Sequence, residues 1–124
     1  MTKIPEAERT IMEQAIYLPM VLTILHRDLS IIQHAAFKLK QPYVDLIEET
    51  ILTVQKELKE AKQYLRANNL HVTEATRDDA FTRYLFFYKG YKEEHHYFNP
   101  RIRNKVQELM EYYLSKRYAY EKRA

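Results

Sequence analysis

A carboxylate and an imidazole stand three residues apart at Glu93 and His96, the spacing of a Glu-x-x-His metal-binding pair. On a helix this spacing places both side chains on one face, where they can share an ion with ligands from neighbouring helices. A carboxylate-bridged two-metal bundle needs a second such pair and further Glu residues on two other helices. The sequence has one pair only, so it favours a solvated Glu/His cluster over a metal centre, and we expect no cofactor.

A second group of chemically capable residues is basic and lies in the C-terminal half, together with most of the eleven tyrosines. Lys and Arg bind the phosphates of nucleic acids, and aromatic rings stack on bases. The candidate phosphate-binding residues are Arg101, Arg103, Lys105, Lys116 and Arg117. Acidic residues interrupt this surface and the net charge is only +3, so nucleic-acid binding is an alternative hypothesis rather than the first one.

Motifs for catalysis are scarce in this chain. Without Cys, thiolate chemistry and cysteine-ligated metals are excluded, and Gly90 alone cannot form a glycine-rich phosphate loop. His26 and Ser30 are one helical turn apart, but no orienting acid or oxyanion donor accompanies them. We therefore expect a protein that is not an enzyme.

Apolar residues at intervals of three and four positions predict the helices that would carry these side chains. In a helix over residues 42–68 the stripe comprises Ile47, Ile51, Val54, Leu58, Ala61 and Leu65. The same spacing predicts a helix over about residues 77–97, with Gly90 in its interior and the stripe Phe81, Tyr84, Tyr88, Tyr91, His95 and Phe98. Both segments are predicted to pack against other helices.

Proline and asparagine mark the remaining boundaries. Pro5 suits the first turn of a helix reaching about residue 32, which we expect to kink at Pro19, and Asn99-Pro100 predicts the start of a last helix. Thr76 and Asp79 have capping-box spacing, and one short β-like run at residues 70–75 cannot form a sheet alone. The prediction is an all-α, antiparallel up-down-up-down four-helix bundle with a proline-kinked first helix, in a single domain over residues 1–124.

The location follows from what the N-terminal part contains. The longest apolar run, residues 15–25, is shorter than the ~20 residues of a bilayer span. Residues 1–8 hold one Lys and two acids, unlike the basic and apolar regions of a signal peptide. We expect a cytoplasmic protein without a membrane partner.

Aromatic residues exceed what a narrow helical core needs, with eleven Tyr and five Phe in 124 residues. Aromatic side chains are favoured at protein interfaces because they bury a large area with few rotatable bonds. We therefore predict a non-enzymatic protein-interaction module that forms a homo-oligomer or binds a protein partner. Its interface is expected at Phe87, Tyr91 and Tyr112.

Three segments carry a resemblance to a known family. Residues 2–9 (TKIPEAER), 17–22 (YLPMVL) and 37–43 (FKLKQPY) resemble the small YhjD-like proteins of spore-forming Gram-positive bacteria. The resemblance implies a bacterial cytoplasmic protein. None of the three segments is a catalytic signature, so no site residue is carried over from it.

Overall fold

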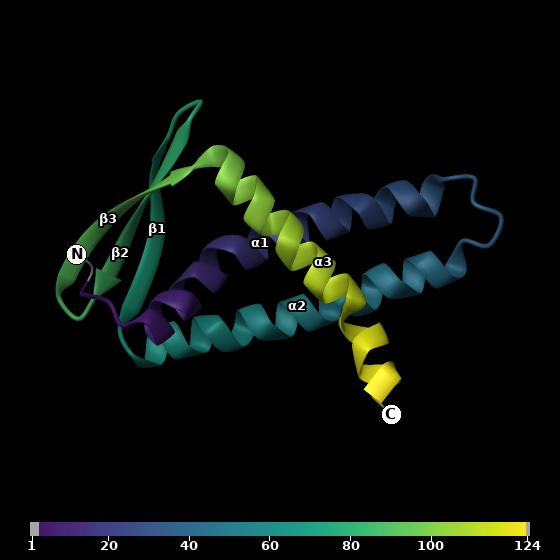
Figure 1. Ribbon diagram of the computed structural model, residues 1–124, viewed down its shortest axis with the longest axis horizontal. Coiled ribbons are helices and arrows are strands. Elements are labelled where there is room, and N and C mark those ends of the chain that lie inside the picture. Colours follow the sequence, from purple (N-terminus) through teal and green to yellow (C-terminus); the bar gives the residue numbers. More distant parts are fainter. Residues whose placement is uncertain (1–2, 124) are drawn as a thin grey trace.

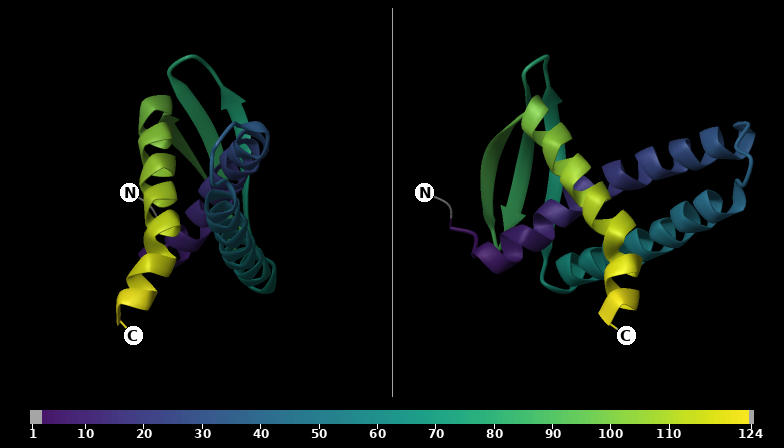
Figure 2. Two further views of the ribbon diagram at one scale, coloured as in Figure 1. Left: turned by 90° about the vertical axis from the view of Figure 1, so that its right-hand side faces the viewer. Right: turned by 45° about the vertical axis from the view of Figure 1, so that its right-hand side comes forward.

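The computed structural model describes the backbone of residues 3–123 and the side chains of residues 3–115. In chain order its elements are α1 (Glu6–His34), α2 (Gln41–Ala67), β1 (Leu70–Arg77), β2 (Phe81–Tyr88), β3 (Tyr91–Phe98) and α3 (Asn99–Arg123). The helices α1 and α2 form a long hairpin, the sheet lies at the end away from the hairpin loop, and α3 crosses the hairpin (Figures 1 and 2).

The first two helices form where they were predicted, and α2 buries the predicted stripe. All six apolar residues of the predicted α2 stripe are at most 8% exposed. The helix α1 continues across Pro19, and its inward face includes Met12 and Val21, which are fully buried. After α2, Asn69 adopts a left-handed φ of 56°, as its residue type indicated. A 3.6-residue apolar period thus specifies α2 and the face it buries, whereas in α1 the apolar residues between Ala15 and Leu25 are too continuous to mark one face.

Residues 70–98 form a three-stranded antiparallel sheet, in the order β1-β2-β3, instead of a third helix. The prediction of an all-α four-helix bundle is therefore wrong, and the fold is α+β. Thr82, Tyr84 and Phe86 alternate along β2 and are at most 4% exposed, because they face the helices. Phe81, which the helical spacing placed inside, is 44% exposed on the other face. Aromatic and β-branched residues favour such a pleated, half-buried strand.

Gly90 occupies a turn and not a helix interior. Together with Lys89 it forms the two-residue connection between β2 and β3, and both residues have positive φ, 86° and 44°. Positive φ at both central positions defines the type I′ turn, whose twist matches that of paired strands. The glycine that was placed inside a predicted helix is therefore well suited to the hairpin turn.

The predicted capping box at Thr76 and Asp79 is also wrong, because no helix begins there. Thr76 belongs to β1, and Asp78 organises the turn that follows. The Asp78 carboxylate accepts hydrogen bonds from the backbone N–H of Ala80 at 2.8 Å and of Phe81 at 2.7 Å. These two bonds lower the pKa of Asp78, because they stabilise its ionised form.

The last helix begins where Asn99 and Pro100 predicted. The Asn99 side chain joins it to the sheet: its Oδ1 accepts from the Thr82 hydroxyl at 2.7 Å, and its Nδ2 donates to the Asp78 carbonyl at 2.9 Å. The helix α3 then crosses α1 and α2, and the Tyr113 hydroxyl donates to Glu57 of α2 at 3.1 Å. Asn99 therefore sets the direction in which α3 leaves the sheet.

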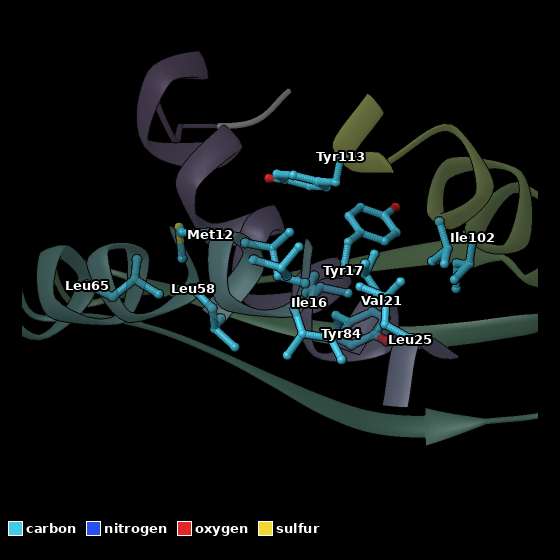
Figure 3. Close-up of a cluster of buried hydrophobic side chains, with 14 of the residues drawn as sticks. Met12, Ile16, Tyr17, Val21, Leu25, Leu58, Leu65, Tyr84, Ile102 and Tyr113 are labelled. Atoms are coloured by element: carbon cyan, nitrogen blue, oxygen red, sulfur yellow. The ribbon is translucent and has the colours of Figure 1, made fainter. Parts of the chain in front are cut away.

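The core lies where the α1/α2 hairpin, the helix-facing side of the sheet and α3 meet. Figure 3 shows side chains from α1, α2, β2 and α3 converging there, among them Met12, Ile16, Val21, Leu58, Leu65, Tyr84, Ile102 and Tyr113. One cluster therefore joins the helices to the sheet.

The helix α1 has the length and composition of a membrane span, with an 18-residue window of mean hydropathy 1.4. Core helices of soluble proteins and N-terminal signal sequences meet the same criterion. This property alone therefore does not place the helix in a membrane.

Candidate functional site

The helix-facing side of β3 carries polar side chains at alternate positions, Glu93, His95 and Tyr97. They share this face with Tyr84 and Phe86 of β2, because His95 pairs with Tyr84 and Glu93 pairs with Phe86. The imidazole of His95 is 3.0 Å from a Glu93 carboxylate oxygen and contacts the Phe86 ring edge-on, with centroids 4.7 Å apart. Strand alternation thus places a carboxylate, an imidazole and a phenol in a row against α1.

Glu13 of α1 and the segment that precedes α1 hold this row of β3 in place. The Tyr97 hydroxyl donates to Glu13 at 2.9 Å. At the other end of the strand, the backbone N–H of Lys3 donates to Glu93 at 2.8 Å. Burial raises the pKa of Tyr97 and the adjacent Glu13 raises it further, so the phenol remains a hydrogen-bond donor at neutral pH. The polar groups at this junction therefore position the sheet against the helix.

A cleft of about 660 Å³ opens beside this row, between the N-terminal half of α1, β3 and the first half of α3. Three cationic side chains line it: Arg9 from α1, and Arg101 and Lys105 from successive turns of α3. Glu13 is the one carboxylate among the cleft-lining residues, and it already accepts the Tyr97 hydrogen bond. We call this space the basic cleft.

Tyr17 lines the basic cleft and is only 7% exposed. Its ring meets that of Tyr97 edge-on, with centroids 6.4 Å apart. Burial, with a contribution from Glu13, raises the pKa of Tyr17 to about 12, so its hydroxyl stays protonated at neutral pH. A second cleft of about 580 Å³, mostly apolar, lies on another side of α3, and Met20, Thr82 and Ile102 are among its lining residues.

The predicted metal pair, Glu93 and His96, is separated by the strand. Residues three apart in a strand point to opposite faces, and the register places His96 beside Arg83 on the side away from the helices. Glu93 instead pairs with His95. Among the residues that the structure describes, no group of three or more His, Cys, Asp or Glu side chains could hold a metal ion.

The predicted interface residues do not share one surface. Phe87 lies on the sheet face away from the helices, whereas Tyr91 pairs with Tyr88 on the opposite side and has the Lys3 ammonium 4.2 Å from its ring centroid. Tyr112 is 55% exposed on α3. Only Phe87 therefore belongs to the uncovered sheet face.

The predicted nucleic-acid residues divide between the two clefts. Arg101 and Lys105 line the basic cleft, and Arg103 lines the apolar one. Lys116 and Arg117 lie in α3 beyond the residues whose side chains are described. The three predicted phosphate-binding residues whose side chains are described thus lie on two sides of α3.

Sequence reasoning missed Arg9 and Tyr17 as cleft residues, although their spacing with Glu13 is that of one helix face. It also missed the outward-facing side of the sheet. The sequence did contain a pattern that indicates a β-hairpin: Lys89-Gly90 stands between two eight-residue segments rich in aromatic side chains.

Comparison with known proteins gives one consistent match. The model of the family described as YhjD protein matches residues 3–118. A protein of Bacillus subtilis (strain 168), "Uncharacterized protein YhjD", is 46% identical over 114 residues, which cover 92% of this chain and 95% of that protein. No solved structure matches. The resemblance expected from the sequence is confirmed.

Proposed function

This chain belongs to the YhjD family, and because the family name assigns no activity, we propose a function from the geometry: a non-enzymatic protein-interaction module that self-associates. The surface we assign to self-association is the sheet face turned away from the helices, here called the outer face. It comprises His71, Thr73, Thr76, Phe81, Arg83, Leu85, Phe87, Lys92, Glu94, His96 and Phe98.

Aromatic rings on this uncovered face are the observation that carries the proposal. Phe81 and Phe98 are 44% and 43% exposed and their ring centroids are 5.4 Å apart. Nearer the β2–β3 turn, the rings of His71 and Phe87 are 5.7 Å apart. Exposed apolar side chains gathered on one face are typical of protein-protein contact sites.

The outer face suits a second copy of the same chain, because it carries both signs of charge. Arg83 and Glu94 form an ion pair of 3.2 Å across β2 and β3, and Lys92 lies on the same face. In a two-fold dimer each patch meets its own copy, so basic residues of one subunit can approach Glu94 of the other. A face that carried charges of only one sign would instead repel the same face of a second copy.

The size of the outer face sets the expected strength of self-association. Eight-residue strands extend ~27 Å, and three strands are ~14 Å wide, so the footprint is only several hundred Å². This is the low end of the interface range, where association is weak and transient. We therefore expect a dimer that dissociates in the micromolar range.

Sedimentation velocity over a concentration series, extending well above the micromolar range, tests the proposal. The variant Phe87→Asp should remain a monomer, because a carboxylate would be buried opposite its own copy. The matched control Leu52→Asp changes an α2 residue that is 66% exposed and should sediment like the unchanged protein. A monomer throughout the series, or equal behaviour of the two variants, would contradict the proposal.

The non-enzymatic part of the proposal is supported by the structural partners of the polar side chains. Glu93 binds the backbone of Lys3, and Tyr97 binds Glu13, so both are explained by the packing of the sheet on α1. We also propose a cytoplasmic location without a membrane partner. Fractionation of the native host tests it, and recovery in the membrane fraction would contradict it.

A further inference from the structure

The basic cleft has the size of a small-molecule site. Its volume of about 660 Å³ lies within the ~300–1,000 Å³ of typical ligand pockets. Its walls come from α1, β3 and α3, with Phe81 from β2, and the shared core holds these elements together. A cleft between packed elements presents its side chains in a largely pre-formed arrangement.

The cationic side chains of the cleft lack anionic partners. Arg9, Arg101 and Lys105 form no ion pair within the part of the chain that the structure describes, in contrast to Arg77 and Arg83. Three like charges facing one space repel one another unless an anion offsets them. Glu13 is the one carboxylate among the described cleft-lining residues, and its single negative charge leaves a surplus of positive charge in the cleft.

The same cleft offers a neutral donor and an apolar wall. The Tyr17 hydroxyl makes no hydrogen bond with the described residues and points away from the aliphatic cluster in Figure 3. Leu18 and Leu109 line the cleft beside it. A few convergent polar groups against apolar surface are the arrangement that fixes the orientation of a bound small molecule.

We infer that the basic cleft binds a small organic phosphate, with the phosphate group between Arg9, Arg101 and Lys105 and the remainder of the molecule against the apolar wall. A phosphate monoester carries close to two negative charges at neutral pH and accepts several hydrogen bonds. The planar guanidinium groups can each donate two parallel bonds to it. Arg9, Arg101 and Lys105 lie outside the outer face, although Phe81, His96 and Phe98 belong both to that face and to the cleft lining.

Adenosine 5′-monophosphate is the probe, with adenosine as the control that lacks the phosphate. Isothermal calorimetry and ligand-dependent thermal unfolding of the full chain should detect binding of the monophosphate and not of adenosine. The double variant Arg101→Gln/Lys105→Gln should weaken binding about tenfold or more, because it removes charge-assisted hydrogen bonds.

The matched control is Lys59→Gln/Lys62→Gln, which removes the same charge from exposed positions of α2. It should leave the affinity for the monophosphate unchanged, and circular dichroism verifies that both double variants are folded. Equal weakening in the two double variants, or no binding at millimolar monophosphate, would overturn the inference. Binding of single-stranded RNA without binding of the monophosphate would also overturn it, in favour of a nucleic-acid surface.

Discussion

Phe86 and Phe81 provide the sharpest test of the strand assignment. Helical spacing predicts that Phe81 is the more buried of the two, whereas in the sheet Phe86 is the more buried. The helical stripe included Phe81 and omitted Phe86. In the sheet Phe86 is 0% exposed and stacks against Tyr97 at 6.4 Å, whereas Phe81 is 44% exposed. Alanine at each position therefore measures which face of residues 81–88 is buried.

The structure sets the expected magnitudes. Replacing the fully buried Phe86 by Ala should cost about 3–5 kcal/mol, from lost burial and from the cavity left behind. Fully burying a Phe side chain contributes about 1.5–3 kcal/mol, so Phe81→Ala, with just over half of the residue covered, should cost roughly 1–1.5 kcal/mol. With a urea slope near ~2 kcal/mol/M, the two unfolding midpoints should differ by about 1–2 M.

Urea unfolding followed by circular dichroism provides the assay, at a dilution where self-association contributes little. Because total stability is about 5–15 kcal/mol, Phe86→Ala could leave the chain unfolded. Phe86→Leu and Phe81→Leu form a milder pair in which the same ranking should hold. A Phe81 variant that loses as much stability as its Phe86 counterpart, or more, would refute the assigned strand faces.

Three further perturbations test the turn, the buried phenols and the junction with α3. Gly90→Ala should destabilise the fold by about 1 kcal/mol in urea unfolding, because the φ of Gly90 is 86°. If Gly90 lay inside a helix, the same substitution would stabilise the fold. Burial raises the pKa of Tyr17, Tyr97 and Tyr113 above the ordinary 10.0, so the folded state holds more protons in alkali than the unfolded state. The stability that these protonated phenols contribute should therefore be fully present below pH 10 and should fall as the pH rises toward and through about 12. Tyrosinate absorbance should appear at correspondingly high pH. A urea midpoint that does not change over this pH range would contradict the prediction. Asn99→Ala should cost about 1–3 kcal/mol in thermal unfolding, because a buried hydroxyl loses its acceptor, and an unchanged midpoint would show that the bond does not stabilise the fold.

The two long helices were predictable as helices, and the buried face of α2 was predictable too, because its apolar residues follow a single period. In α2, residues between Ile47 and Leu65 repeat every three or four positions and exposed polar residues fill the intervals. Only one face of such a segment can be buried, and only a helix buries it. The start of α3 was predictable from Asn99-Pro100 for an equally local reason, the backbone preference of proline and of the residue before it.

The sheet was not predicted, because both faces of β2 carry aromatic or aliphatic residues. Phe86 and Phe87 are neighbours, one fully buried and one on the outer face, so apolar residues can be chosen at helical spacing as easily as at strand spacing. Residues 70–75 of β1 were noted as β-like, but they had no evident strand partner until residues 81–98 were known to pair. Pairing is a long-range choice, and it decided the fold class.

The composition of the chain and its local periods specify two amphipathic helices, the start of a third and an excess of aromatic rings. The tertiary structure alone assigns those rings to two sheet faces and places Arg9 in one cleft with Arg101 and Lys105, which are far from it in the sequence. The physical reason is range: a helix closes its hydrogen bonds within four residues, whereas a strand, or a cleft between elements, depends on partners that only the folded chain supplies.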